Sequence, residues 1–183
     1  MDFTEADLEY VRANYLTLAD ACQGRPETPA DVHRLAYRRL LPGPAYVAPD
    51  GTEYVPRDYF ALADEAGGPA RLEAWFRERV GDIEEWDAYL TGLYAVCLRD
   101  VRPATILRKS ALVESLRALL AEPRPDDDEW RQRLRTEVDE LDELERPFSP
   151  DLDRVRFGKP PTRDELVEGP RRSYPDVFRT VPA

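Results

Sequence analysis

The sequence predicts a mainly α-helical protein with one small β-hairpin, followed by a helical part that a proline-rich, irregular tail clasps. Three observations lead to this prediction. Apolar residues recur at helical spacing over most of residues 1–145, and the stretch AYVAPDGTEYVP at 45–56 has the pattern of a hairpin. Seven prolines fall within residues 146–183, which excludes a long helix or a central strand there.

The amino-terminal part contains explicit helix start signals. Thr4 and Asp7 have the spacing of a capping box, and Thr28 precedes Pro29, a residue suited to the first helical position. Asp50-Gly51 lies between tyrosine- and valine-bearing flanks and predicts a tight hairpin turn. The predicted order is therefore helix, turn, helix and a two-stranded hairpin.

The central part reads as a series of helices. The spacing predicts them at 57–65, 70–80, 86–98, from Pro103 to Pro123, and from the acidic run at 126–129 to Pro147. The helix at 86–98 carries Trp86, Tyr89, Leu90, Leu93 and Cys97 on one face. In the tail, apolar residues between the prolines predict docking on these helices, and Thr162-Arg163-Asp164-Glu165 predicts a short helix that ends at Gly169.

Composition excludes several classes of function. A net charge of −11 over 183 residues disfavours general nucleic-acid coating, and no apolar run approaches the roughly 20 residues that cross a bilayer. We therefore expect a cytoplasmic protein without membrane contact. His33, Cys22 and Cys97 are far apart in sequence, so we expect neither a zinc site nor a disulfide framework. Nucleotide-binding and nucleophile-elbow motifs are absent from the sequence, so we predict no cofactor.

The segment DLDRVRFGKPPTRD at 151–164 is the main candidate site, because it gathers both signs of charge around a glycine and two prolines. Arginine grips carboxylates and phosphates with two hydrogen bonds. The predicted ligand-binding residues are Arg154, Arg156, Arg163 and Arg99, and the predicted acid/base or amine-holding residues are Asp153, Asp164 and Lys109. The alternative is a clamp, in which these arginines pair with the acidic helix before Pro147 and fix the tail to the body. We interpret Cys97 as a small core residue and His33 as solvent-facing.

LADACQG, TPADVHRLAYRRLLP and APDGTEYVP, within residues 17–60, resemble the winged helix-turn-helix of MerR-type regulators. The resemblance implies that the helix from Pro29 enters the major groove, with four residues facing the bases: His33, Arg34, Tyr37 and Arg38. Twelve acids against six bases in residues 1–66 depart from this pattern, because phosphate neutralisation supplies much of the affinity for DNA. We divide the chain into a winged-helix-like portion at 1–66, a helical part at 67–145 and a docking tail at 146–183, or one compact domain that combines them.

YLTGLYAVCLRDVRPATILRK at 89–109 and LERPFSPDLDRVRFGKPPTRDELV at 144–167 resemble an uncharacterised actinobacterial domain family found among natural-product biosynthesis genes. The resemblance runs from about Phe3 to Pro175. The sequence departs from the family pattern at 92–95, where Gly-Leu-Tyr-Ala replaces Gly-Glu-Tyr-Gly. It departs again at 102–104, where Arg-Pro-Ala replaces Thr-Pro-Glu. The resemblance implies a role in small-molecule biosynthesis and carries over no functional residues.

We therefore expect a bacterial protein of specialised metabolism that binds or transforms a small anionic molecule such as an amino acid. The alternative is a transcriptional regulator that binds DNA as a homodimer through the helix from Pro29. The second alternative is a non-catalytic module that binds a basic partner protein through its acidic helices.

Overall fold

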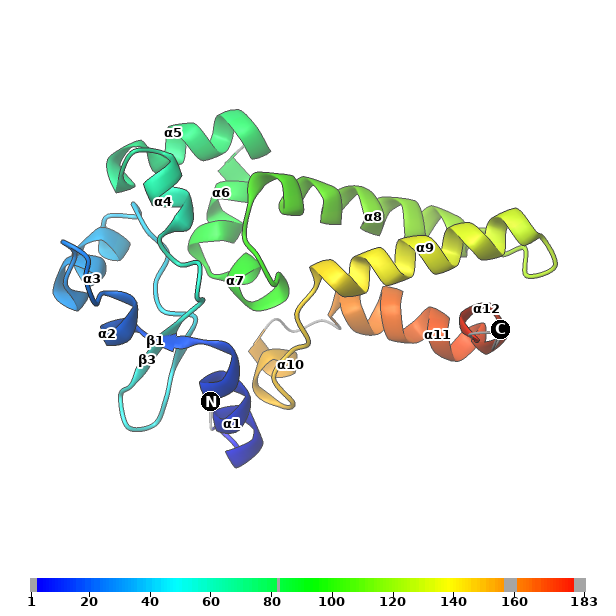
Figure 1. The fold of residues 1–183 in the computed structure, drawn as a ribbon, viewed down its shortest axis with the longest axis horizontal. Coiled ribbons are helices and arrows are strands. Elements are labelled where there is room, and N and C mark those ends of the chain that lie inside the picture. The colour runs from blue at the N-terminus through cyan, green and yellow to red at the C-terminus, as the bar shows by residue number, and fades with distance from the viewer. Residues whose placement is uncertain (1–2, 82, 157–160, 180–183) are drawn as a thin grey trace.

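The computed structural model describes residues 3–81, 83–156 and 161–179, with the backbone alone for Arg154 and Arg156. The protein is mainly α-helical with a small antiparallel sheet, as the sequence predicts. Figure 1 shows a broad lobe formed by the first half of the chain and a long helical hairpin that extends from it. The tail runs back beneath this hairpin.

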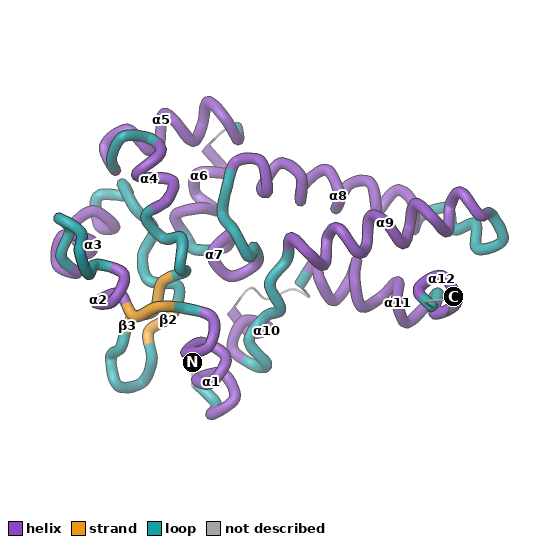
Figure 2. Tube along the Cα trace, viewed as in Figure 1, coloured by secondary structure: helices purple, strands orange, loops and turns teal. Residues whose placement is uncertain are grey.

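The amino-terminal lobe is built around the predicted hairpin. Strands β2 (Tyr46–Val47) and β3 (Glu53–Val55) are antiparallel, and the turn between them contains Gly51 at φ 83°. A third strand, β1 (Leu16–Thr17), pairs with the other edge of β3, so the sheet order is β1-β3-β2. Figure 1 labels β1 and β3, and Figure 2 colours the strands orange and labels β2 and β3. The sequence did not predict β1, because two residues are too few to show an alternating pattern.

The helices of this lobe are α1 (Glu5–Asn14), α2 (Leu18–Ala21), α3 (Pro29–Tyr37), α4 (Ala61–Glu65) and α5 (Pro69–Val80). Two of them, α1 and α3, begin at the predicted capping signals, whereas the helix predicted at 57–65 begins only at Ala61. Both predicted caps are present: the side chains of Thr4 and Thr28 accept hydrogen bonds from the backbone of Asp7 and Asp31, and each aspartate bonds back to the backbone of its threonine. These reciprocal bonds satisfy amides that would otherwise have no partner in the first helical turn.

Asp7 also connects the start of the described chain to α10 (Leu152–Arg156), in the carboxy-terminal tail. Its side chain is fully buried, and its Oδ1 accepts hydrogen bonds from the backbone amides of Asp151 and Leu152 at 3.1 and 3.2 Å. These amides lie at the start of α10, which Figure 1 shows next to α1. One carboxylate therefore bonds to the capping residue of α1 and to the start of α10.

The predicted helix at 86–98 is wrong as a single helix. The structure has α6 (Ile83–Leu90) and α7 (Leu93–Cys97), separated by Gly92 in the left-handed conformation at φ 77°. A left-handed residue cannot continue a right-handed helix, and glycine adopts this conformation at little cost. The break turns α7 to a new direction, so Cys97 comes to lie near the end of the long hairpin.

Two long antiparallel helices, α8 (Pro103–Ala121) and α9 (Asp128–Leu144), form the hairpin. Asp127 caps α9 by accepting hydrogen bonds from the amides of Glu129 and Trp130. A separate hydrophobic core fills the space between these helices and the tail, and its buried members are Leu112, Leu116, Trp130, Leu134, Val138, Leu141, Leu166, Val167 and Val177.

The tail docks as predicted, but it is more regular than predicted. After α10, the described part continues through the π-helix η1 (Asp164–Glu168), α11 (Gly169–Ser173) and α12 (Pro175–Phe178). Gly169 does not end the helix, because its N–H donates to the carbonyl of Asp164 in a wider π-type turn. A wider turn lets the helix run through Pro170, which has no N–H and whose ring would clash with a carbonyl in a regular turn.

Candidate functional site

A cavity of about 670 Å³ lies where α6, α7 and α8 meet the tail. A volume of this size suits a small organic ligand. Apolar surface makes up most of its wall, which is formed by Glu85, Leu93, Tyr94, Cys97, Ile106, Lys109, Ser110, Val113, Arg117, Phe148, Pro161, Thr162, Asp164, Glu165 and Arg172. An apolar wall with a few polar groups is the usual composition of a ligand-binding pocket.

Lys109 is the cation in the wall that is most removed from water. Its side chain is 13% exposed, and its Nζ lies 2.9 Å from Oε1 of Glu145, whose side chain is 1% exposed. The hydroxyl of Thr162 donates a hydrogen bond to the same carboxylate oxygen. The other oxygen, Oε2, is buried and has no hydrogen-bond partner among the described residues. The cluster therefore joins α8, the end of α9 and the tail at one buried carboxylate.

Backbone pairing between the ends of α7 and α9 positions this cluster. Leu98 and Glu145 form an antiparallel bridge, in which the N–H of Arg146 donates to the carbonyl of Cys97 at 3.0 Å. The N–H of Arg99 donates to the carbonyl of Leu144, also at 3.0 Å. These bonds hold Cys97 close to Glu145, where its thiol interacts with Lys109.

Burial and pairing act in opposite directions on the ionisable groups of the cluster. Burial acts to lower the pKa of Lys109, but its interactions with Cys97 and Glu145 prevail and hold that pKa above its ordinary value. Burial raises the pKa of the Cys97 thiol, and the neighbouring Lys109 offsets this effect only in part. At neutral pH Lys109 is therefore an ammonium group and Cys97 a neutral thiol.

Most of the other charged groups in the wall are paired. Arg117 binds both carboxylate oxygens of Glu165 at 3.0 and 3.2 Å, and the hydroxyl of Tyr94 donates to Glu85. Arg172, in the last turn of α11, is exposed. Within the described part of the chain its guanidinium has neither an ion pair nor a hydrogen bond. It is therefore the lining cation with free capacity for an anion.

The structure brings together only some of the predicted site residues. Lys109 and Asp164 both line the cavity. Arg163 points to α9 instead and forms ion pairs with Asp142 and, at 3.6 Å, with Glu168. Arg171 joins the same group by binding Asp142 at 2.7 Å. These contacts are those of the alternative clamp, in which tail arginines pair with the acidic helix.

The remaining predicted site residues lie away from the described wall of the cavity. Asp153 is fully buried beside the sheet, where it accepts hydrogen bonds from the hydroxyl of Tyr46 at 2.7 Å and the amide of Ser149 at 2.9 Å. Arg99 is exposed and does not belong to the cavity lining. The side chains of Arg154 and Arg156 lie outside the described residues, so the predicted roles of these arginines stay predictions.

Three residues of the DNA-binding alternative lie on α3, and the fourth, Arg38, follows its last turn. Tyr37 is 91% exposed, and Arg38 is also exposed. His33 lies 2.7 Å from Glu53 of β3, and Arg34 pairs with Asp31 one turn earlier. Binding to a phosphate or a base would have to displace these two acidic partners.

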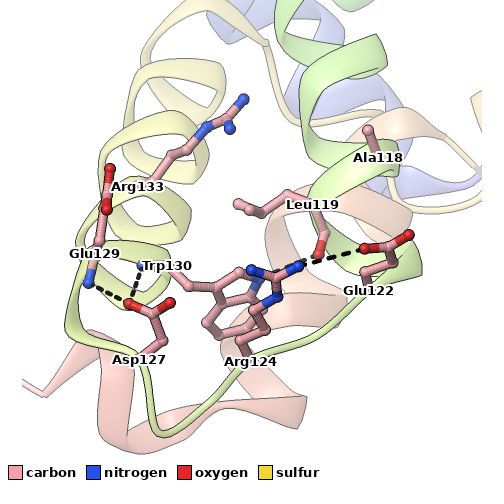
Figure 3. A pocket seen from close by; sticks show the side chains of 8 residues that line it. All are labelled: Ala118, Leu119, Glu122, Arg124, Asp127, Glu129, Trp130 and Arg133. Atoms are coloured by element: carbon pink, nitrogen blue, oxygen red, sulfur yellow. Dashed lines mark hydrogen bonds and ion pairs between the residues drawn. The ribbon is translucent and has the colours of Figure 1, made fainter.

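A second, shallower hollow of about 360 Å³ lies at the tip of the helical hairpin (Figure 3). Its polar groups serve local structure: Trp130 Nε1 donates to the carbonyl of Leu119 at 3.1 Å, and Asp127 caps α9. Arg124 lies 3.5 Å from Glu122, and Figure 3 shows this pair across the same opening. The hollow is therefore explained by helix capping and packing.

Among the described residues, no group of three or more histidine, cysteine, aspartate or glutamate side chains is arranged to hold a metal ion. None of the helices in the described ranges is both long and apolar enough to cross a membrane.

The chain belongs to a family of unknown function (DUF6058), which it matches over residues 70–175. No curated protein and no solved structure matches the chain. All the described residues that line the larger cavity fall within the matched range, whereas α1 to α4 and the sheet precede it. The described lining of the cavity thus lies within the segment that matches the family.

Sequence reasoning missed Glu145, Thr162 and Arg172 as parts of the site. Glu145 follows a helix with many acids and reads as one more surface charge, and Arg172 is one of many arginines. Lysine is rare in this chain, which was the available signal for Lys109.

Proposed function

We propose that the protein binds a small, mainly apolar molecule with an anionic group, such as an amino acid or a related carboxylic acid, in the 670 Å³ cavity. The observation that carries this proposal is a largely apolar wall that includes Arg172, a cation without a partner among the described residues. The apolar wall would hold the body of the ligand, and the planar guanidinium would bind its carboxylate through two hydrogen bonds.

The resemblance to a domain family of natural-product gene clusters extends this proposal. We place the protein in the specialised metabolism of a bacterium, in the cytoplasm, where a cavity of this kind would bind a pathway compound. Lys109 and Asp164 are the wall residues with chemistry to offer such a compound, as an amine and a carboxylate. Arg163 contributes by pairing with Asp142, which fixes the tail that supplies one wall.

Thermal unfolding in the presence of candidate ligands tests this function. The panel contains phenylalanine, phenylpropionate, inorganic phosphate and a short DNA duplex. A ligand that binds only the folded protein, at a hundred times its dissociation constant, adds about 2.7 kcal/mol of stability. For a domain of this size such a gain raises the melting temperature by about 5–10 °C. We expect this shift with the apolar carboxylate.

Two arginine variants give the matched comparison. Arg172→Ala removes the unpaired cation of the cavity wall, and Arg38→Ala removes an exposed arginine at the end of α3 that also has no ion pair among the described residues. The carboxylate-dependent shift should disappear in Arg172→Ala and persist in Arg38→Ala. An unchanged shift in both variants, or a shift with duplex DNA alone, contradicts the proposal.

A further inference from the structure

Lysine is used sparingly in this chain, and one of its lysines occupies a buried position in the cavity wall. The sequence has two lysines, Lys109 and Lys159, against 24 arginines. Across the described ranges, the other ion pairs use arginine or His33 as the cation. Only the pair with Glu145 uses lysine among the described residues, and it is also the pair that lies deepest at the cavity.

The choice of lysine has a chemical consequence at this position. A guanidinium would fit a carboxylate at least as well, through two parallel hydrogen bonds, but it does not lose its proton in proteins. An amine can lose its proton and then act as a nucleophile. Glu145 Oε1 lies 2.9 Å from Nζ and can accept this proton directly. The second oxygen of the same carboxylate, Oε2, accepts no hydrogen bond from the described residues, so it is also available to carry the proton.

We propose that Lys109 forms an imine with the carbonyl carbon of an apolar aldehyde or ketone bound in the cavity. This inference rests on the proposed function, because it requires a small ligand in the same cavity. It adds the class of ligand, a carbonyl compound, and the residue that binds it covalently. The carbonyl group belongs either to a plain aldehyde or ketone or to a 2-oxo acid, whose carboxylate offers a partner to Arg172.

The atoms of the step balance without an added reagent. The ammonium of Lys109 transfers a proton to Glu145, and the free Nζ forms a bond to the carbonyl carbon as the C=O π bond breaks. One N–H proton then moves from the nitrogen to the former carbonyl oxygen, which becomes a hydroxyl group. This hydroxyl group takes the second proton back from Glu145 and leaves as water, while the nitrogen lone pair forms the C=N bond. The net change converts the ammonium and the carbonyl compound into a protonated imine and one water molecule.

The surroundings favour this sequence of proton transfers. The resting amine is protonated, so the reaction begins when the ligand displaces water from the cavity. Loss of water disfavours a separated pair of charges and thereby favours transfer of the proton from Lys109 to the carboxylate. The product carries a positive charge again, and the buried Glu145 carboxylate stabilises it at the same place.

Reductive trapping on the intact protein tests the inference. The protein is incubated with phenylacetaldehyde or with phenylpyruvate in the presence of cyanoborohydride, which delivers hydride to the imine carbon and leaves a stable secondary amine. Peptide mass mapping then locates the adduct. The chain offers few competing amines, because Lys159 is the only other lysine. A carbonyl held at the amine reacts faster than one in solution, so we expect about tenfold or more adduct on Lys109 than on Lys159.

Variants separate the covalent step from binding. Lys109→Arg keeps the positive charge beside Glu145 but cannot form the imine, and Lys109→Met serves if the larger arginine disturbs folding. Both should lose the adduct. Arg172→Ala should reduce trapping of phenylpyruvate more than trapping of phenylacetaldehyde, since only the first carries a carboxylate.

The outcomes for this inference differ from those for the proposed function. Phenylpropionate has no carbonyl carbon that forms an imine, so its thermal shift reports the cavity alone. If phenylpropionate stabilises the protein and no adduct forms on Lys109, the inference is wrong and the proposed function stands. An adduct confined to Lys159 or the terminal amine also overturns the inference. If no compound shifts the melting temperature and none is trapped at Lys109, both are wrong.

Discussion

Asp7 joins parts of the chain that lie 144 positions apart, and removing its carboxylate tests how strongly they are held together. The fully buried side chain accepts two remote hydrogen bonds, from the amides of Asp151 and Leu152, in addition to the local bonds from Thr4. A hydrogen bond to a charged acceptor contributes about 1.5–3 kcal/mol. The two remote bonds therefore amount to about 3–6 kcal/mol, a large part of the stability of an ordinary domain.

Asp7→Ala should accordingly lower the free energy of unfolding by about 3–6 kcal/mol, measured by urea denaturation followed by circular dichroism. Asp31→Ala is the matched control, since Asp31 belongs to the same kind of capping box at Thr28 but has no remote backbone partner among the described residues. Asp31→Ala should lower the free energy of unfolding by clearly less than Asp7→Ala does. Equal losses in the two variants would refute the reasoning, because the remote hydrogen bonds would then contribute nothing.

Lowering the pH should remove the stabilisation that the Asp7 carboxylate provides. Burial acts to raise the pKa of Asp7, but the hydrogen bonds from Thr4, Asp151 and Leu152 prevail and hold that pKa below its ordinary value. An acid with a depressed pKa in the folded state stabilises the protein above its unfolded pKa and loses this effect as the pH falls through the folded pKa. The stability gap between the wild type and Asp7→Asn should therefore be full above about pH 5 and narrow below about pH 4. A gap that stays constant down to pH 2 would show that the carboxylate charge is not involved.

Three further outcomes are expected. Leu166→Ala, at a buried position between the tail and the hairpin, should lower the free energy of unfolding by about 2–5 kcal/mol and expose the tail to limited proteolysis. Val155→Ala, at a side chain that is 67% exposed, should change neither property. A tail that stays resistant to proteolysis in Leu166→Ala would contradict the docking. Gly92→Ala should lower the free energy of unfolding by about 1–2 kcal/mol, measured by thermal unfolding, because an alanine is strained at φ 77°. Gly43→Ala, where an added Cβ meets no atom within 4 Å, should lower it less. Equal losses in the two variants would argue against backbone strain at Gly92. A fluorescently labelled duplex should show no salt-dependent change in anisotropy, and binding that Arg38→Ala weakens would support the regulator alternative.

Most of the helices were predictable from local signals, whereas of the site only Lys109 and Asp164 were named in advance. Thr4, Thr28 and the Asp50-Gly51 turn act over a few residues, so each start and turn was visible in the sequence. The break at Gly92 was missed because the apolar spacing continues across it and a single glycine is tolerated within a helical pattern. The cavity brings residues from 85 to 172 together through the pairing of Leu98 with Glu145, and no local pattern encodes such a long-range contact.

The charged segment at 151–164 also shows that local sequence cannot decide long-range contacts. Its mixed charges allowed a ligand pocket or a clamp, and the choice depends on which helix lies opposite. Arg163 meets Asp142 of α9, whereas Asp164, the next residue, lines the cavity. Neighbouring residues on a helix point about 100° apart, so one short stretch serves both purposes.

The tail supplies Pro161, Thr162 and Arg172 to the cavity, and this fixes when the cavity can first exist. During translation, α8 and α9 leave the ribosome before these residues, and Lys109 and Glu145 then face water as an ordinary exposed pair of little energetic value. The cavity, and the largely buried environment of the amine in its wall, arise only when the last helices pack on the hairpin. A nascent or clipped chain that lacks them would therefore contain Lys109 without the cavity.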